Sequence, residues 1–341
     1  MTALSAKDPI SAARYRSLAV VGAGAWGTAL AAIAAMGGAK VTLWAREPEI
    51  VASIAKMREN DLFLSGVKLP ETIEATSDIS RAGVADAVLI AAPAQHLRAV
   101  LTLLRGAFKP GTPAVLCAKG IELNTGLLLP EVLAEVLPEA EPAMLSGPSF
   151  ARDVARGLPT AVTIAARAGI ASRLAVTLGK GAFRPYVSED VTGVALGGAA
   201  KNVYAIACGM VEGAGLGESA RAALLSRGFA ELLRLSVALG AHAETLMGLS
   251  GLGDLVLTAT SMSSRNYALG HALGQGATLK EMLGAGKPLA EGAATAPALV
   301  VRARKHGVEL PIAENVAAVL EGTLSVGAAA ERLLARPLAK E

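Results

Sequence analysis

Residues 18–36 read LAVVGAGAWGTALAAIAAM, and this stretch decides the fold of the first half of the chain. A short apolar run passes into the pattern G-x-G-x-x-G, formed by Gly22, Gly24 and Gly27, and then into a run of helix-forming residues. The first glycine permits a tight turn, the second lets a pyrophosphate approach the backbone, and the third lets helix and strand pack closely. Any tight strand-to-helix turn can recruit glycine, but in this context the pattern favours a dinucleotide bound at the helix N-terminus.

The next predicted strand, residues 40–44, ends where a ribose-binding residue is expected, and the chain continues with Ala45, Arg46 and Glu47. An arginine at this point can pair with the 2′-phosphate of NADP(H), whereas Glu47 could accept a ribose hydroxyl of NAD(H). The sequence therefore favours NADP(H) over NAD(H) without excluding NAD(H). The alternative is that Arg46 is only a surface residue.

Three further apolar runs, residues 85–92, 113–118 and 143–145, have the continuous character of buried parallel strands. Lys119 follows the second run, and Gly147 and Ser149 follow the third. Ligands of open parallel sheets bind outside the carboxyl ends of the strands, so we expect these residues to line the cofactor cleft. Alternatively, Lys119 is an exposed loop residue and Ser149 caps the helix that begins near Phe150.

Composition narrows the class of protein. The chain has 341 residues, 52% of them hydrophobic and 18% charged, with a net charge of +3 and only 3% aromatics. These values exclude disorder and offer no nucleic-acid surface. Cys117 and Cys208 lie far apart in apolar runs, so the sequence predicts no disulfide, no metal site and a cytoplasmic location. Glycines interrupt the uncharged residues 17–39, so we expect no membrane span.

The second half is predicted to be helical. Residues 159–165 and 183–187 read as two more strands, and glycine- and alanine-rich helical patterns begin near residue 191. We therefore expect a loose tail over residues 1–16, a dinucleotide-binding domain over 17–190 and an all-helical substrate domain over 191–341. Apolar helical surface in this half is compatible with a homodimer.

Polar residues interrupt the apolar helical half at three places: Lys201-Asn202, Asp254 after a two-glycine turn, and Ser263-Ser264-Arg265-Asn266. The helical neighbours of Lys201 are small and apolar, so this lysine is either buried in a cleft or extends its ammonium group to water. Asp254 and Ser264 could each cap a helix. A helix N-terminus with hydroxyls, an amide and a guanidinium group is equally suited to hold a phosphate.

Seven strings occur in a specific order: GAGAWGTALA, AKGIE, SGPSFA, LGGAAKNVYAIACGM, GLGDLVLTAT, SRN and AEG. In this arrangement the chain resembles the bacterial NAD(P)-dependent sn-glycerol-3-phosphate dehydrogenases from about residue 18 to 322. The resemblance implies a Rossmann-type α/β domain with a mostly parallel sheet, followed by an all-α domain of the 6-phosphogluconate-dehydrogenase-like kind. It implies reversible reduction of dihydroxyacetone phosphate to sn-glycerol 3-phosphate, which supplies phospholipid synthesis.

The resemblance also implies residue roles. Lys201 matches the family's proton donor and acceptor. The other substrate-binding positions are Lys119, Gly147, Ser149, Asn202, Asp254, Ser264, Arg265 and Asn266. The cofactor-binding positions are Gly22, Gly24, Ala25, Trp26, Gly27, Arg46, Lys119, Ala151, Arg265, Leu289 and Glu291.

Two positions depart from the family pattern, because Ala25 and Ala94 stand where serine is usual. One or two hydroxyl contacts to the cofactor are then either missing or supplied by water. Reduction of a ketone leaves a developing alkoxide, which requires a proton donor such as Lys201. Burial and Lys119 would lower the pKa of Lys201, and a nearby Asp254 would raise it. Two other readings stay open: a related reductase of another small hydroxy or keto acid, and a non-catalytic dinucleotide sensor.

Overall fold

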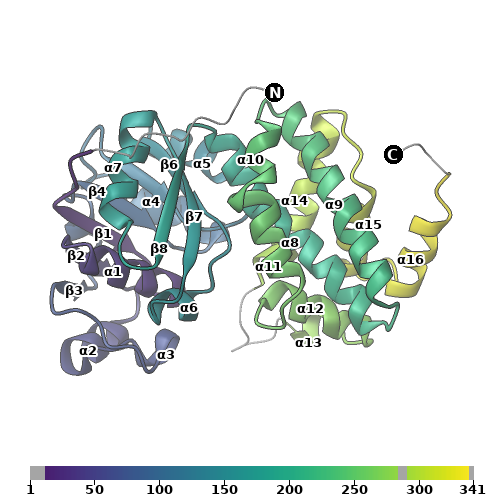
Figure 1. Ribbon diagram of the computed structural model, residues 1–341, viewed down its shortest axis with the longest axis horizontal. Helices are drawn as coiled ribbons and strands as arrows, with labels where there is room; N and C mark the ends of the chain where they lie inside the picture. Colours follow the sequence, from purple (N-terminus) through teal and green to yellow (C-terminus); the bar gives the residue numbers. More distant parts are fainter. Residues whose placement is uncertain (1–11, 283–289, 338–341) are drawn as a thin grey trace.

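The computed structural model describes residues 12–282 and 290–337, in which a helix-covered sheet lies beside a bundle of helices (Figure 1). The sheet has eight strands in the order β3-β2-β1-β4-β5-β6-β7-β8. All neighbours are parallel except β6 and β7, so the last two strands run opposite to the other six. The strands are β1 (Ser17–Val21), β2 (Lys40–Trp44), β3 (Ile73–Thr76), β4 (Ala87–Ile90), β5 (Pro113–Leu116), β6 (Glu141–Ser146), β7 (Thr160–Ala165) and β8 (Phe183–Ser188).

Both faces of the sheet are covered, which explains why its central strands are continuously apolar. Alternate residues of β1 point to opposite faces: Leu18 and Val20 join one core, whereas Ala19 and Val21 join the other. The second core continues into the helical half. The helices of the sheet half are α1 (Ala25–Met36), α2 (Pro48–Met57), α3 (Asp61–Leu64), η1 (Ile79–Ala82), η2 (Ala94–His96), α4 (Leu97–Leu104), α5 (Leu129–Val136), α6 (Ala151–Ala155) and α7 (Ala168–Leu178).

The predicted fold class is confirmed: a mostly parallel Rossmann-type sheet precedes an all-helical region. Each predicted strand is present, and β3 is an additional one. Its sequence, Ile-Glu-Ala-Thr, lies at the edge of the sheet and is partly exposed, so it lacks the apolar run that marks the central strands. The domain limits stay predictions, although β8 ends at Ser188 and the next helix begins at Val191.

The helical half is built around α8 (Val191–Gly213), which packs against most of the other helices and also contacts strand β6 of the sheet (Figure 1). In the described part of the chain, α8 is the one helix long and apolar enough to cross a membrane, and its most apolar window is completely buried inside the fold. The remaining helices are α9 (Glu218–Ala238), α10 (Ala243–Met247), η3 (Leu249–Gly253), α11 (Asp254–Ala259), α12 (Arg265–Gly274), α13 (Leu279–Met282), α14 (Glu291–Lys305), α15 (Pro311–Leu320) and α16 (Val326–Leu334).

Helices α8 and α12 pack backbone to backbone through glycines. A Cβ atom added at Gly209 would lie 2.2 Å from the carbonyl oxygen of Tyr267, and one at Gly270 would lie 2.0 Å from that of Ile206. Both distances are far below van der Waals contact, so neither position accepts a side chain. This close approach brings the start of α12, with Arg265 and Asn266, beside the Lys201 segment of α8.

We expect Gly270→Ala to lower the free energy of unfolding by about 3 kcal/mol, because the new methyl group must push α12 away from α8. Gly327→Ala is the matched control, since a Cβ there meets no atom within 4 Å and alanine favours a helix. The control should be neutral or stabilising by up to about 1 kcal/mol. Urea titration of both variants measures the difference, and equal effects would contradict close packing at Gly270.

Candidate active site

The glycine-rich turn has the geometry that a dinucleotide needs. Gly22 has a φ of +110°, which is strained for any residue with a side chain, and a Cβ at Gly27 would lie 1.9 Å from the Gly22 carbonyl oxygen. At Gly24, by contrast, a Cβ would meet nothing within 4 Å, so the backbone there faces open space. Helix α1 begins at this point with no acidic residue in its first turn and no capping side chain. These features fit a bound pyrophosphate.

A buried asparagine holds this turn, and the sequence did not indicate it. Asn60, which is fully buried, donates through Nδ2 to the Ala23 carbonyl oxygen at 2.7 Å and to Thr28 Oγ1 at 2.8 Å. Thr28 itself donates to the same carbonyl oxygen. Asn60 follows α2 in a polar stretch, so only the tertiary contact distinguishes it from a surface asparagine.

The other predicted cofactor positions of this region lie close by. Ala25 and Trp26 form the start of α1, and Ala151 begins α6, which packs against α1. The indole Nε1 of Trp26 is buried and has no hydrogen-bond acceptor among the described residues. Arg46 follows β2 and is largely exposed, and its Nε and Nη2 atoms donate to Glu47 Oε1 at 3.0 and 2.7 Å.

The centre of the candidate site is a carboxylate shared by two lysines. Lys201 Nζ lies 2.9 Å from Asp254 Oδ1, and Lys119 Nζ lies 2.6 Å from Asp254 Oδ2. Lys201 and Asp254 are buried, and Lys119 is almost so. Lys119 comes from the sheet half and the other two from α8 and α11, so this cluster joins the two halves of the molecule. Asp254 starts α11 without capping it, because its side chain faces the lysines.

A chain of amide hydrogen bonds connects this cluster to α12 and α14. Asn202 Nδ2 donates to the Lys119 carbonyl oxygen at 3.0 Å, and Asn266 Nδ2 donates to Asn202 Oδ1 at 2.9 Å. Asn266 Oδ1 in turn accepts from the Gly292 backbone N–H at 2.9 Å. Both amide side chains are thereby held in one orientation, and the predicted residues Lys119, Asn202 and Asn266 are brought together.

Thr258 is a member of the cluster that the sequence reasoning missed. Lys201 Nζ donates to Thr258 Oγ1 at 2.6 Å, and this hydroxyl donates to Asp254 Oδ1 at 3.2 Å. Thr258 is buried on α11, four residues after Asp254. That spacing places two side chains on one helical face, which is the signal that could have identified it.

Burial dominates the acid–base properties of the cluster. Burial lowers the pKa of Lys201 to about 8. The negative charge of Asp254 acts in the opposite direction, whereas the positive charge of Lys119 adds to the lowering. For Asp254, burial alone would raise the pKa, but the adjacent charges of Lys119 and Lys201 outweigh it, and the pKa falls below its ordinary value. At neutral pH the site therefore contains a carboxylate between two ammonium groups.

The remaining predicted residues surround the cluster less directly. The Gly147 carbonyl oxygen accepts from Lys119 Nζ at 3.0 Å and from Ser149 Oγ at 2.9 Å, so Ser149 does not cap α6, and the capping alternative is wrong. Ser264 caps α12 through the Tyr267 backbone N–H. Arg265 is exposed, and within the described residues it makes no hydrogen bond or ion pair.

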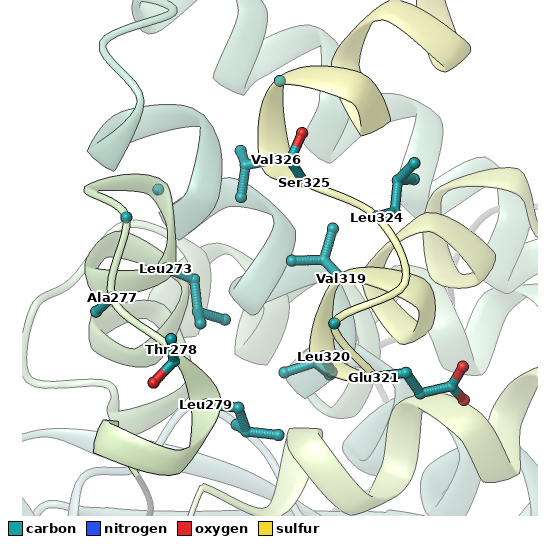
Figure 2. Close-up of a pocket in the computed structure, with 14 residues that line it drawn as sticks. Leu273, Ala277, Thr278, Leu279, Val319, Leu320, Glu321, Leu324, Ser325 and Val326 are labelled. Atoms are coloured by element: carbon teal, nitrogen blue, oxygen red, sulfur yellow. The ribbon is translucent and has the colours of Figure 1, made fainter.

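Glu291 reaches from α14 to the sheet half, where its Oε1 accepts from the Ala94 backbone N–H at 2.9 Å. Leu289 lies outside the described residues. A separate pocket of about 460 Å³ opens between the α12–α13 and α15–α16 connections (Figure 2), and Glu321 is the one charged residue among those that line it. That pocket does not suit a phosphate, whereas the lysine cluster does.

The fold and the site define a two-part dinucleotide-binding protein with a buried lysine between the parts. Models of the N-terminal and C-terminal regions of NAD-dependent glycerol-3-phosphate dehydrogenase match residues 17–170 and 190–331. The chain therefore belongs to the NAD-dependent glycerol-3-phosphate dehydrogenase family, and the resemblance seen in the sequence is confirmed.

Individual relatives agree with this assignment. The chain is 57% identical to a glycerol-3-phosphate dehydrogenase (NAD(P)+) of Parvibaculum lavamentivorans, over 96% of this chain and 98% of the relative. It is equally identical to one of Bradyrhizobium sp. (strain ORS 278), over 96% and 99% of the two chains. The crystal structure of the glycerol-3-phosphate dehydrogenase from Coxiella burnetii has a TM-score of 0.89 and 38% identity, over 95% of this chain and 99% of that one.

We expect Asp254→Asn to lower the free energy of unfolding by about 3–5 kcal/mol at pH 7, because it leaves two adjoining cations without their shared carboxylate. Asp61→Asn is the control, since Asp61 is exposed and makes no hydrogen bond or ion pair within the described part of the chain. It should change stability by no more than about 0.5 kcal/mol. Chemical denaturation of both variants decides the matter, and similar values would show that Asp254 does not compensate the lysines.

Proposed function

We propose that the protein interconverts dihydroxyacetone phosphate and sn-glycerol 3-phosphate by hydride transfer with NAD(P)H. The observation that carries the proposal is the position of Lys201, buried between Asp254 and Thr258 with a pKa lowered to about 8. Family membership and the names of the relatives in Parvibaculum and Coxiella support the same reaction.

The cofactor's phosphates would lie at the start of α1, where Gly22, Gly24 and Gly27 leave the backbone accessible. Trp26, with its unpaired Nε1, and Ala151 would line the same cleft. When bound, NAD(P)H supplies the hydride. Arg46, which is exposed and paired with Glu47, would bind a 2′-phosphate, and this favours NADP(H). Glu47 would accept a ribose hydroxyl of NAD(H).

Lys201 would act as general acid in reduction and as general base in oxidation. As the substrate carbonyl is reduced, negative charge develops on its oxygen, and the Lys201 ammonium can neutralise this charge by donating a proton. An acid whose pKa lies near the working pH transfers its proton efficiently in both directions. Asp254 and Thr258 hold the ammonium in place, so little reorganisation is needed when the charge appears.

The phosphate group of the substrate would be held by Lys119 and by the start of α12. Ser264, Arg265 and Asn266 combine a helix N-terminus with a hydroxyl, an amide and an exposed guanidinium group without a partner among the described residues. Such a set suits a dianionic phosphate monoester. Gly147 and Ser149 would line the substrate cleft beside Lys119, since the Gly147 carbonyl oxygen accepts from both Lys119 and Ser149. Glu291 would contribute from the start of α14.

The first experiment measures oxidation of NADPH, and then of NADH, with dihydroxyacetone phosphate and with unphosphorylated dihydroxyacetone. We expect oxidation only with the phosphate ester. Tight cofactor binding without oxidation would instead favour a non-catalytic dinucleotide sensor, and oxidation with another keto acid would favour a related reductase.

Arg265→Ala should raise the KM for dihydroxyacetone phosphate at least about tenfold, since a charge-assisted hydrogen bond to phosphate is lost. Steady-state kinetics measures this change, and an unaltered KM would place the phosphate elsewhere.

Lys201→Met should lower turnover at least about 100-fold while leaving the affinity for NADPH nearly unchanged. NADPH fluorescence is the binding control, and normal turnover in the variant would remove Lys201 from this role.

The rates of the unaltered protein should depend on pH. Ketone reduction needs the protonated lysine, so its rate should fall as the pH rises through about 8. Alcohol oxidation needs the neutral amine, so its rate should rise through the same range. Steady-state kinetics from pH 6 to 10 measures both rates.

Four further expectations accompany the reaction. We infer that the protein acts in the cytoplasm, which its two free, buried cysteines support. A role in phospholipid synthesis follows from the product. A homodimer and the domain limits at residues 17, 190 and 191 stay predictions.

A further inference from the structure

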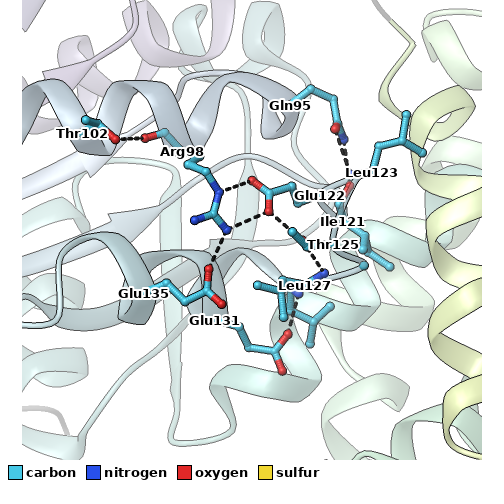
Figure 3. Close-up of polar contacts among 12 residues, drawn as sticks. Gln95, Arg98, Thr102, Ile121, Glu122, Leu123, Thr125, Leu127, Glu131 and Glu135 are labelled. Atoms are coloured by element: carbon cyan, nitrogen blue, oxygen red, sulfur yellow. Dashed lines mark hydrogen bonds and ion pairs between the residues drawn. The ribbon is translucent and has the colours of Figure 1, made fainter.

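The loop between β5 and α5 contains Lys119, and two residues that follow β4, Gln95 of η2 and Arg98 of α4, hold this loop. Figure 3 shows both side chains. Gln95 holds the backbone: its Nε2 donates to the Ile121 carbonyl oxygen at 2.7 Å, and its Oε1 accepts from the Leu123 backbone N–H at 3.0 Å. This pair of hydrogen bonds spans the position of Glu122. The loop backbone is therefore constrained within two to four residues of Lys119.

Arg98 holds the side chain of Glu122, which lies between the two backbone contacts of Gln95. Its Nε and Nη2 atoms donate to Glu122 Oε1 and Oε2, both at 2.9 Å, in a bidentate pair (Figure 3). Thr125 Oγ1 also donates to Glu122 Oε2, at 2.6 Å. The Glu122 side chain is only 11% exposed. Hydrogen bonds from Arg98 hold its pKa below the ordinary range, so the pair stays ionised at neutral pH.

The guanidinium group of Arg98 also binds a second carboxylate, that of Glu135, which can be compared with Glu122. Arg98 Nη2 lies 2.7 Å from Glu135 Oε2, but Glu135 belongs to α5 and its side chain is 54% exposed. Glu135 touches no residue of the loop between Lys119 and Leu123 by any hydrogen bond in the described chain. Arg98 thus binds one carboxylate on the Lys119 loop and one away from it.

We propose that Glu122, gripped by Arg98, is a positioning residue that holds the Lys119 ammonium at the substrate. Glu122 touches neither Asp254 nor Lys201, so it acts through the backbone that joins it to Lys119. The adjoining Gly120 transmits the constraint, since it packs where a Cβ would lie 2.7 Å from the Ala94 Cβ atom. The inference rests on the proposed role of Lys119 in binding dihydroxyacetone phosphate.

A contact from the helical half secures the far end of this loop. Arg302 of α14 donates to the Gly126 carbonyl oxygen at 3.0 Å and forms a bidentate pair with Glu131, at 2.8 Å for each bond. Glu131 in turn accepts from the Leu128 backbone N–H. The loop is fixed at both ends, and the Arg98–Glu122 pair is the contact nearer to Lys119.

The test compares Glu122→Gln with Glu135→Gln by steady-state kinetics with dihydroxyacetone phosphate and NADPH. The glutamine amide presents a donor to the Arg98 donors, so the bidentate pair is lost while the side-chain size is kept. We expect Glu122→Gln to raise the KM for dihydroxyacetone phosphate about five- to tenfold, with kcat changed less than about twofold and NADPH affinity retained. Glu135→Gln should change all three values less than about twofold, and equal effects of the two variants would overturn the proposal.

A double-mutant cycle with Lys119→Met separates positioning from general loss of structure. If Glu122 acts through Lys119, Glu122→Gln should raise the KM no further in the Lys119→Met background, whereas independent effects would multiply. Multiplication would overturn the positioning role but leave the proposed function intact. A normal KM for Lys119→Met alone would overturn the role of Lys119, and the inference with it. If Glu122→Gln folds poorly, Arg98→Lys keeps the charge, removes the fork and should show the same KM change and non-additivity.

Discussion

The burial of α8 is the constraint on which the rest of the structure depends. Every residue from Gly193 to Val211 is buried, and the helix contacts α9, α11, α12, α14, α15 and the strand β6. Glycines along it allow α12 to approach so closely that the two backbones touch. A charged side chain in such a helix is costly unless its charge is compensated. Lys201 is therefore stable only because Asp254 and Thr258 meet its ammonium group.

The same burial sets the acid–base properties of Lys201. Withdrawal from water lowers its pKa to about 8, which is the range that the proposed proton transfer requires. Asp254 opposes that effect and also binds Lys119, so a single carboxylate organises one lysine from each half of the molecule. The cluster carries a net positive charge when both lysines are protonated, and this charge favours an anionic substrate. In the proposed mechanism, the atoms that compensate the buried charge would also perform the acid–base catalysis.

Contacts outside the cleft hold the helical half against the sheet half. Glu291 at the start of α14 binds the backbone of the β4–α4 connection, and Arg302 near the end of α14 binds the β5–α5 loop. The helical half therefore touches the sheet half at both ends of one helix. Between these points, Arg98 and Gln95 hold the loop that contains Lys119. These contacts hold the loop that contains Lys119 against the helical half.

The sequence alone indicated the class of fold, and it named residues that the structure brings together, among them Lys119, Lys201 and Asp254. The glycines at 22, 24 and 27 and the apolar runs after them define a parallel sheet, because backbone sterics and complete burial leave few alternatives. Strand β3 was not predicted, since a short, half-exposed edge strand has no comparable signal. Only the tertiary structure decided which polar residues meet: Asn60 at the glycine turn, Thr258 beside Lys201 and Glu122 under Arg98. It also decided that burial outweighs Asp254 in the pKa of Lys201, because both effects depend on distances between residues far apart in the chain.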